Sequence, residues 1–247
     1  MKLLVANPNS TASMTQKIAR TACQVARPGT RIIAVDNASG PASIQGFYDG
    51  AVCLSGLLEQ VDRHRCVDGV VIACFDDTGL DAVRCMVEAP VVGIGESACF
   101  AASMLSNKFT VITTLSRSVP ILESNLLRYG LASRCARVRA TDIPVLELEN
   151  MDSGTTETIR RAVELAIRED RSDAIVLGCA GMTDFATSLT HEFGLPVVDG
   201  LSCAVTFAEA LVAANLRTSK VGAYGFPRAP MIATGERRET GDASKRP

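Results

Sequence analysis

The stretch "IVLGCAGM", residues 175–182, decides the fold because an apolar strand pattern runs directly into Gly, Cys, Ala and Gly. On its own, Cys179 is typical of a small buried hydrophobe at a strand end, since free cysteine is among the most buried residue types. A second stretch, "VVIACFDD" at residues 70–77, ends another apolar run at Cys74. Two thiols in matching places after two similar strands indicate a repeated unit.

Three pairs of landmarks relate the two halves of the chain by a nearly constant offset. The differences are 105 for Asp68 and Asp173, 105 for Cys74 and Cys179, and 106 for Pro90 and Pro196. A spacing that is kept over three landmarks indicates a duplicated unit of that length and not a short solenoid period.

Short apolar runs alternate with helical patterns in both halves, which predicts parallel strands covered by helices. The expected strands span residues 2–6, 31–35, 69–74, 90–95 and 109–114, with counterparts of the third and fourth in residues 173–179 and 195–200. The expected helices span residues 10–26, 50–64, 79–88, 97–106, 120–130 and 156–170, and an irregular connection begins at residues 141–149.

The fold class that we predict is α/β, with two pseudo-symmetric lobes that each hold a mostly parallel sheet flanked by helices. Ligands of such proteins bind at the carboxyl ends of parallel strands and in clefts between lobes, so the active site is expected in the cleft. Residues 1–98 form the first expected lobe, completed by residues 206–228, and residues 99–205 form the second. Residues 229–247 are polar and charged, which predicts a mobile C-terminal tail.

The composition excludes several kinds of partner. The chain has 247 residues, and its 25 Lys and Arg against 27 Asp and Glu leave no basic face for nucleic acid or acidic lipid. No apolar run approaches the ~18 residues of a membrane span. A small-molecule substrate is the expected partner. Nine cysteines, an odd number, with no apparent secretory leader before them predict free thiols in a reducing cytoplasm.

Metal chemistry has little support in this sequence. The two histidines, His64 and His191, are far apart and lie beside charged residues on expected helix surfaces. Neither Cys-x-x-Cys nor His-x-x-x-His spacing occurs, so we expect no metal site.

Two opposed thiols can racemise a carbon acid. A thiolate on one side removes a proton while a thiol on the other side returns one, which inverts the configuration. Both cysteines precede an expected helix, whose N–H groups favour the thiolate. Backbone amides near Gly178, Ala180 and Gly181 can approach the substrate closely and stabilise an enolate oxygen, so no cofactor is expected.

Five short motifs occur in the order found in a known family: "NPNS", "GPASIQG", "ACFDD", "TVITTL" and "VLGCAGM". They resemble the hydantoin racemase branch of the aspartate/glutamate racemase superfamily, which includes allantoin racemases. The resemblance runs from residue 1 to about residue 228 and includes the repeat spacing. It implies that Cys74 and Cys179 are the two catalytic acid/base residues.

Departures from the amino-acid racemases of this superfamily bear on the substrate. Glutamate racemases carry Thr and His after the second cysteine, where this chain has Ala180 and Gly181. They carry Asn and Thr after the first, where this chain has Phe75 and Asp76. A free amino acid would lose partners for its carboxylate, whereas Asp76 or Asp77 can accept N–H bonds from a cyclic ureide. The expected activity is cofactor-independent racemisation of 5-monosubstituted hydantoins, with allantoin racemase or an aspartate/glutamate-type racemase as the alternative.

Other candidate substrate contacts each have a structural alternative. Asn9 follows the first strand, where Asn-Pro-Asn is also ordinary turn chemistry. Thr113 and Thr114 hold the equivalent place in the second half, where they are also typical of a β-branched strand end. The resemblance places Pro41, Ser43 and Ile44 in a loop that lines the pocket, although a surface turn fits them too. Phe75 packs on the C5 substituent or in the core.

Three rival functions use the same α/β pattern. A two-lobed small-molecule sensor needs no thiol beside its ligand. A cysteine hydrolase needs a base beside the nucleophile, and neither histidine follows an expected strand. A thiol/disulfide enzyme needs its two thiols close enough to bond, which leaves no room for a substrate between them. Helices rich in Ala and Leu around an exposed cleft favour a homo-oligomer.

Overall fold

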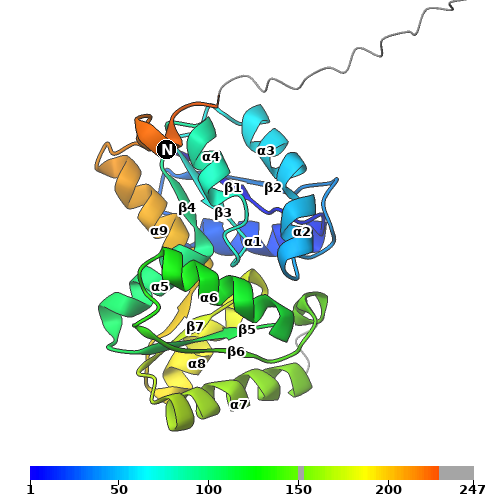
Figure 1. Cartoon of the computed structure of the whole chain (residues 1–247), viewed down its shortest axis with the longest axis vertical. Coiled ribbons are helices and arrows are strands. Elements are labelled where there is room, and N and C mark those ends of the chain that lie inside the picture. The colour runs from blue at the N-terminus through cyan, green and yellow to red at the C-terminus, as the bar shows by residue number, and fades with distance from the viewer. Residues whose placement is uncertain (150–152, 228–247) are drawn as a thin grey trace, which may run out of the picture.

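The computed structural model describes residues 1–149 and 153–227, and the chain folds into two stacked lobes (Figure 1). The predicted tail, residues 229–247, lies outside the described residues, as does residue 228. The strands are β1 (Lys2–Ala6), β2 (Arg31–Val35), β3 (Gly69–Ile72), β4 (Val91–Gly93), β5 (Phe109–Thr113), β6 (Cys135–Ala140), β7 (Ala174–Leu177) and β8 (Val197–Asp199).

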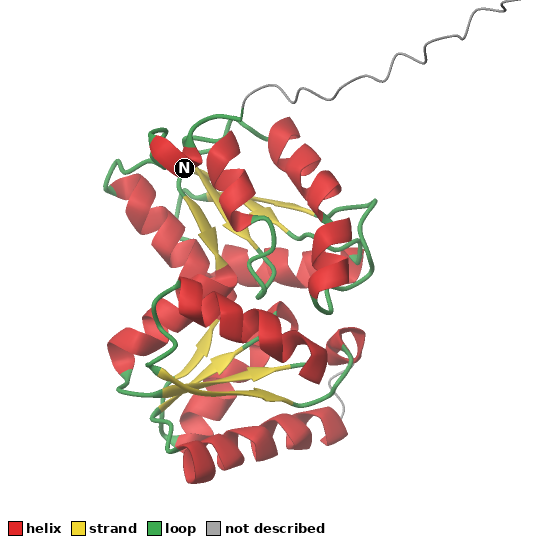
Figure 2. Ribbon diagram, viewed as in Figure 1, coloured by secondary structure: helices red, strands yellow, loops and turns green. Residues whose placement is uncertain are grey.

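Helices connect these strands throughout the described part of the chain (Figure 2). The α-helices are α1 (Ala12–Val25), α2 (Phe47–Val52), α3 (Leu54–Arg63), α4 (Leu80–Met86), α5 (Ile94–Leu105), α6 (Val119–Arg128), α7 (Ser153–Asp170), α8 (Ala186–Phe193) and α9 (Gly200–Ala213). Short 3₁₀ helices are η1 (Ser116–Ser118), η2 (Val145–Glu149), η3 (Ala180–Phe185) and η4 (Gly222–Tyr224).

The two sheets have the same topology. One has the order β2-β1-β3-β4 and the other β6-β5-β7-β8, and every recorded strand pair is parallel. Adding four to each strand number of the first sheet gives the second. The predicted α/β class with two similar parallel lobes is therefore confirmed.

The central strands of each sheet are buried on both faces, which explains why β1, β3, β5 and β7 read as nearly continuous apolar runs. Leu3 and Val5 face a core that both lobes share, whereas Leu4 and Ala6 face the outer helices α3 and α4. In the second lobe the outer face packs against α7 and α8. Apolar residues of α1, α5, α6 and α9 belong to the shared core, so these four helices join the lobes.

Helices α5 and α9 exchange sides after the fourth strand of each sheet. Helix α5 leaves the first sheet and packs on β7, and helix α9 leaves the second sheet and packs on β3, β4 and α1. The two helices also pack against each other. This exchange places the carboxyl ends of both sheets next to the same inter-lobe core.

Helix α8, strand β6 and the helix expected over residues 50–64 differ from the sequence prediction, which had no helix at residues 186–193. Strand β6 was missed because its sequence, CARVRA, has one fully apolar buried position, Val138, between two arginines. The single helix expected over residues 50–64 is two helices, because the chain bends at Cys53, where α2 ends and α3 begins.

Within the described ranges, no helix is long and apolar enough to cross a membrane. Over the same residues, no group of three or more His, Cys, Asp or Glu side chains is placed to hold a metal ion.

Candidate active site

Cys74 and Cys179 occupy equivalent positions, each two residues beyond a central strand. The residue before each cysteine still bonds to the neighbouring strand. The Ala73 N–H donates to the Ala6 carbonyl at 2.8 Å, and the Gly178 N–H donates to the Ile112 carbonyl at 2.7 Å. The backbone therefore presents both thiols at the carboxyl edge of their sheets.

Each cysteine also opens the same kind of turn. The Asp77 N–H donates to the Cys74 carbonyl at 3.0 Å, and the Met182 N–H donates to the Cys179 carbonyl at 3.0 Å. Gly178 suits its place because an added Cβ would lie only 3.0 Å from the Ile112 carbonyl oxygen. The small residues of the opening stretch thus let two strands approach closely beside a thiol.

Both thiols line one cavity of about 40 Å³. The predicted site residues on its wall are Asn9, Ile44, Cys74, Phe75, Asp76, Gly178, Cys179 and Ala180. Residues that were predicted as contacts but are not on that wall are Pro41, Ser43, Thr113, Thr114 and Gly181. The structure thus brings residues from both halves of the chain together at a single cavity.

Three wall residues were not expected from the sequence: Met14, Ala73 and Val145. Met14 lies on the apolar face of α1 that packs in the shared core. Val145 follows β6 as Ile44 follows β2, but β6 was not predicted and the repeat offset does not lead from Ile44 to Val145, so no sequence signal pointed to it.

The predicted residues away from the wall have local partners. The Thr113 hydroxyl donates to the Gly178 carbonyl at 3.3 Å, and Thr114 is buried. The Pro41 carbonyl accepts the Ser10 N–H at 2.9 Å, and the Ser43 hydroxyl accepts a bond from Gln45 at 2.8 Å. These contacts support the shape of the loops.

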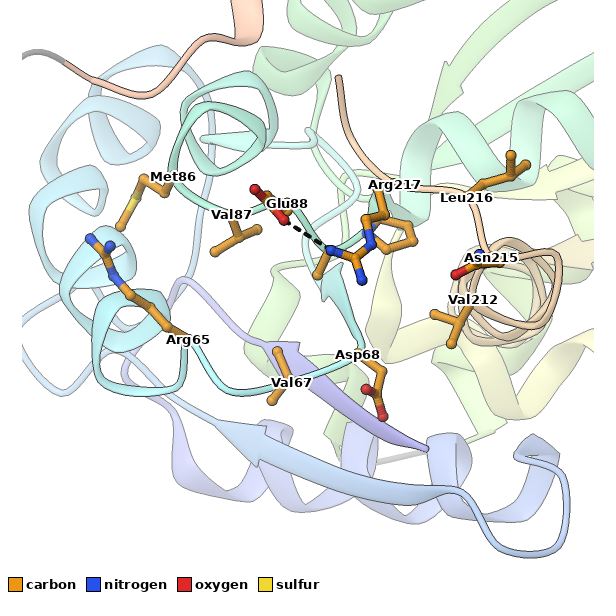
Figure 3. Close-up of a pocket in the computed structure, with 12 residues that line it drawn as sticks. Arg65, Val67, Asp68, Met86, Val87, Glu88, Val212, Asn215, Leu216 and Arg217 are labelled. Carbon is orange, nitrogen blue, oxygen red and sulfur yellow. Dashed lines mark hydrogen bonds and ion pairs between the residues drawn. The ribbon is translucent and has the colours of Figure 1, made fainter. Parts of the chain in front are cut away.

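A larger cavity of about 410 Å³ lies elsewhere in the first lobe (Figure 3). It sits at the opposite edge of the sheet, beside Asp68 and Pro90, which precede β3 and β4. Across it, Arg217 pairs with Glu88 at 3.0 Å. We place the candidate site at the smaller cavity, because ligands of parallel sheets bind at the carboxyl ends of the strands and both matched thiols are there.

Both candidate thiols are withdrawn from bulk water, although each cysteine remains partly exposed. Burial and the charge of Asp76 raise the pKa of the Cys179 thiol to about 11, while a hydrogen bond from the Gly181 N–H and the nearby charge of Lys17 lower it. Burial and the charge of Asp76 raise the pKa of the Cys74 thiol well above its usual range. The backbone N–H groups favour the thiolates as expected, but the loss of hydration outweighs them and both pKa values are raised.

Asp76 is the one charged residue on the described cavity wall. Its side chain is buried, and its Oδ2 atom has no hydrogen-bond partner in the structure. Burial raises the pKa of this carboxyl to about 7. A buried carboxylate oxygen without a partner is costly, so this atom is well suited to accept an N–H from a ligand.

The side chain of Asp77, unlike Oδ2 of the neighbouring Asp76, accepts hydrogen bonds within the protein. Its carboxylate accepts the N–H groups of Gly95 at 2.9 Å and Glu96 at 2.7 Å, and the Tyr129 hydroxyl at 2.5 Å. These bonds tie the Cys74 turn to the start of α5. Burial and the charge of Glu96 raise its pKa to about 7. With its oxygens engaged, Asp77 is not the ligand acceptor that was considered for it.

Asn9 is held by residues of its own loop. Its Oδ1 atom accepts the Asn7 side-chain amide at 2.9 Å and the Thr11 N–H at 3.0 Å, and its Nδ2 contacts the Met14 sulfur at 3.2 Å. The Asn-Pro-Asn motif therefore builds a rigid turn at the end of β1 and also lines the cavity.

Comparisons with known proteins define the family of this chain. The family model described as Asp/Glu/Hydantoin racemase matches residues 3–208. A hydantoin racemase of Rhizobium meliloti is 44% identical over 230 residues, which cover 92% of this chain and 95% of the relative. A hydantoin racemase of Pseudomonas sp. (strain NS671) is 42% identical over 229 residues, 92% of each chain.

Among solved structures, an allantoin racemase from Klebsiella pneumoniae has a TM-score of 0.90 to this chain at 43% identity, and covers 93% of this chain and 94% of its own. Fold and relatives together define an enzyme of the isomerase class. The chain belongs to the Asp/Glu/hydantoin racemase family, as the motif resemblance predicted.

Proposed function

We propose that the cavity is the active site of a cofactor-independent racemase of 5-monosubstituted hydantoins, in which Cys74 and Cys179 are the two bases. The observation that supports this most strongly is the meeting of two thiols, from equivalent ends of duplicated strands, on one cavity wall. The wall also carries the unpartnered carboxylate oxygen of Asp76.

The reaction needs one thiolate and one thiol. The thiolate of Cys179 removes the proton from C5, and the C–H electron pair moves into the neighbouring carbonyl to form an enolate. The thiol of Cys74 then gives its proton to the opposite face of C5, and the enolate pair forms the new C–H bond. Cys179 ends as a thiol and Cys74 as a thiolate, and the other enantiomer reacts in the reverse direction.

Backbone and carboxylate groups hold the ring in this scheme. The Gly178 N–H bonds to Ile112 and the Gly181 N–H bonds to the Cys179 sulfur, so of the three amides expected at this turn we assign Ala180 to the enolate oxygen. The free oxygen of Asp76 accepts a ring N–H.

The wall favours a neutral ring over an amino acid. The described wall residues include no Lys, Arg or His that could pair with an α-carboxylate, and Asp76 would repel one. A cavity of about 40 Å³ holds only a few water molecules. The walls must therefore separate to admit a substituted ring.

Loss of optical rotation from single enantiomers tests this proposal. We expect racemisation of 5-methyl-, 5-benzyl- or 5-ureidohydantoin, little change of free aspartate or glutamate, and full activity after treatment with a chelator. Racemisation of aspartate or glutamate in preference to all three hydantoins would contradict the substrate assignment. Loss of activity with chelator that zinc or manganese restores would contradict the two-thiol chemistry.

The similarity to the Klebsiella allantoin racemase supports a second candidate, allantoin racemase. Allantoin is 5-ureidohydantoin, so the same ring chemistry applies and only the pocket for the C5 substituent differs. A kcat/KM for the ureido compound that exceeds those for the methyl and benzyl compounds by tenfold or more would assign this function.

We also propose a homo-oligomer in a reducing cytoplasm. The exposed side chains of Phe100, Met104 and Leu105 on α5 support an apolar contact between copies, and all nine cysteines are free. Light scattering that gives a single 26.1 kDa chain at micromolar concentration would contradict the oligomer.

The lobe boundaries are likewise proposed to fall within the exchanged helices α5 and α9, near residues 98 and 206. The packing of each helix on the opposite sheet supports this division.

A further inference from the structure

Lys17 lies on α1 beside the first sheet, yet its ammonium group contacts the second half of the chain. Its Nζ donates to the Gly181 carbonyl at 2.8 Å and lies 2.9 Å from Asp184 Oδ2. The lysine side chain is only 13% exposed, so this cation is largely shielded from solvent. Both partners belong to η3, the turn that Cys179 opens.

That turn delivers a hydrogen bond to the candidate base. The Gly181 N–H donates to Cys179 Sγ at 3.4 Å, so Lys17 holds the carbonyl of the residue whose N–H contacts the sulfur. Both the N–H and the charge of Lys17 favour a negative sulfur, and both lower the pKa of Cys179 against the effects of burial and of the charge of Asp76, which raise it.

Lys17 itself is not on the cavity wall, whereas Met14 of the same helix is. The lysine therefore acts on the site through the turn and not by touching a ligand. Helix α1 contributes Met14 to the cavity wall, and through Lys17 it holds the turn that contributes Cys179 to the same wall.

We propose that Lys17 is a positioning residue for the second base: by binding the Gly181 carbonyl and Asp184, it fixes the Gly181 N–H on Cys179 and supplies the positive charge that favours the thiolate there. This inference rests on the proposed function, in which Cys179 is a base. Cys74 lies on the other turn, which Lys17 does not contact.

The effect must be measured on each thiol separately. The two enantiomers have equal free energies in solution, so any variant must keep equal kcat/KM values in the two directions. A loss at Cys179 therefore lowers the rate equally in both directions, and the overall racemisation rate does not show which thiol is affected.

Alkylation provides a readout that needs no substrate. Peptide mass spectrometry after timed iodoacetamide treatment at pH 8 follows Cys179 and Cys74 in the same molecule. In Lys17→Met we expect alkylation of Cys179 to slow about tenfold, as a rise of one pKa unit predicts, and that of Cys74 to change less than about twofold. Lys17→Arg, which keeps the charge and the donors, should restore most of the rate.

Arg20→Met is the matched control, because it removes an exposed cation from the same helix. It should leave both alkylation rates unchanged. Circular dichroism establishes that each variant is folded, and Lys17→Gln replaces Lys17→Met if the apolar variant unfolds. Equal slowing of both thiols, or no slowing of Cys179, would overturn the proposal.

Exchange of the C5 hydrogen in deuterated water then connects the effect to the reaction. In a Cys74→Ser background, Lys17→Met should slow exchange about tenfold, and in a Cys179→Ser background by less than about twofold. An equal decrease in both backgrounds would overturn the role of Lys17. If neither background exchanges any hydantoin, the proposed function fails, and the alkylation rates still decide whether Lys17 acts on Cys179.

Discussion

The turns after Cys74 and Cys179 open with the same backbone hydrogen bond but carry different charged groups. Each begins with a cysteine carbonyl that accepts the N–H three residues later at 3.0 Å. The first turn then carries two buried carboxylates, Asp76 and Asp77, whereas the second carries small residues and is contacted by Lys17. The two equivalent thiols of the duplicated fold therefore lie in different electrostatic environments.

The two turns are also secured in a reciprocal way. Helix α1 follows β1 and provides Lys17 to the second turn, while α6 follows β5 and provides Asn125 to the first, together with Tyr129, the residue directly after α6. The Asn125 side chain donates to the Asp76 carbonyl at 2.8 Å, and the Tyr129 hydroxyl donates to Asp77. Each turn is therefore held by the equivalent helix of the other half.

Replacement of either thiol is expected to have the largest effect. Cys74→Ser and Cys179→Ser should each reduce racemisation by about 10³-fold or more, because a hydroxyl is far harder to ionise than a thiol. Polarimetry of a single enantiomer measures the loss. Cys85→Ser and Cys135→Ser, at sites away from the cavity, are controls and should stay within threefold of the parent. Parent-like activity in either active-site variant would remove that thiol from the mechanism.

The pH dependence of the reaction should show which of the two thiols has the lower pKa. Because the pKa of Cys179 is raised to about 11, the thiolate fraction grows about tenfold per pH unit, and kcat/KM should rise about 100-fold from pH 7 to pH 9. The charge of Asp76 raises the pKa of both thiols and that of Asp77 raises the pKa of Cys74 as well, whereas the Gly181 N–H and Lys17 lower the pKa of Cys179. Exchange that depends on Cys179 should therefore turn on at a lower pH than exchange that depends on Cys74. Exchange that depends on Cys74 and begins at the lower pH would contradict the electrostatic difference between the two turns.

Asp76→Asn tests the carboxylate that distinguishes the first turn. Loss of a hydrogen bond to a charged group costs about 1.5–3 kcal/mol, or about 10–100-fold. The thiols become more acidic without this charge, so we expect a net decrease of about tenfold in kcat/KM at pH 8.

Below pH 7 the parent should lose activity more steeply as Asp76, with a pKa of about 7, gains its proton. The Asn variant should lack this extra steepness. Asp62→Asn, at an exposed carboxylate, is the control. An unchanged acidic limb in Asp76→Asn would show that another group titrates there.

Tyr129→Phe should have a smaller effect that is concentrated on the first turn. It removes one of three donors to the buried Asp77, so we expect the free energy of unfolding to fall by about 1.5–3 kcal/mol, as measured by urea denaturation. Exchange that depends on Cys74 should slow a few-fold more than exchange that depends on Cys179. Tyr224→Phe removes a similar bond to the half-exposed Asp81 and should change little. Equal slowing of both exchange reactions would contradict reciprocal support.

Sequence reasoning found the strands and the thiols because their signals are local. An apolar run that ends in small residues occurs twice, and the offset between the copies is visible without a structure. Strand β6 escaped because Arg137 and Arg139 interrupt its pattern, and pairing with β5 defines it instead. Arg139 bonds to Asp170, thirty-one residues away.

The turns that carry the two thiols are held in place by contacts between residues far apart in the sequence, which no local pattern shows. Asp77 bonds to Gly95, 18 residues away, and to Tyr129, 52 residues away. Lys17 contacts Gly181 across 164 residues. In the sequence each of these looks like an ordinary polar residue of a loop or a helix, because its role exists only after the two lobes pack together.

The most direct test of the two-base account is exchange of the C5 hydrogen by the single variants in deuterated water, followed by NMR for each enantiomer. A variant with one thiol can remove the proton from one face only. We predict that Cys74→Ser and Cys179→Ser each exchange one enantiomer without racemising it, that they prefer opposite enantiomers, and that the double variant matches the uncatalysed rate. Preference of both single variants for the same enantiomer would contradict the account.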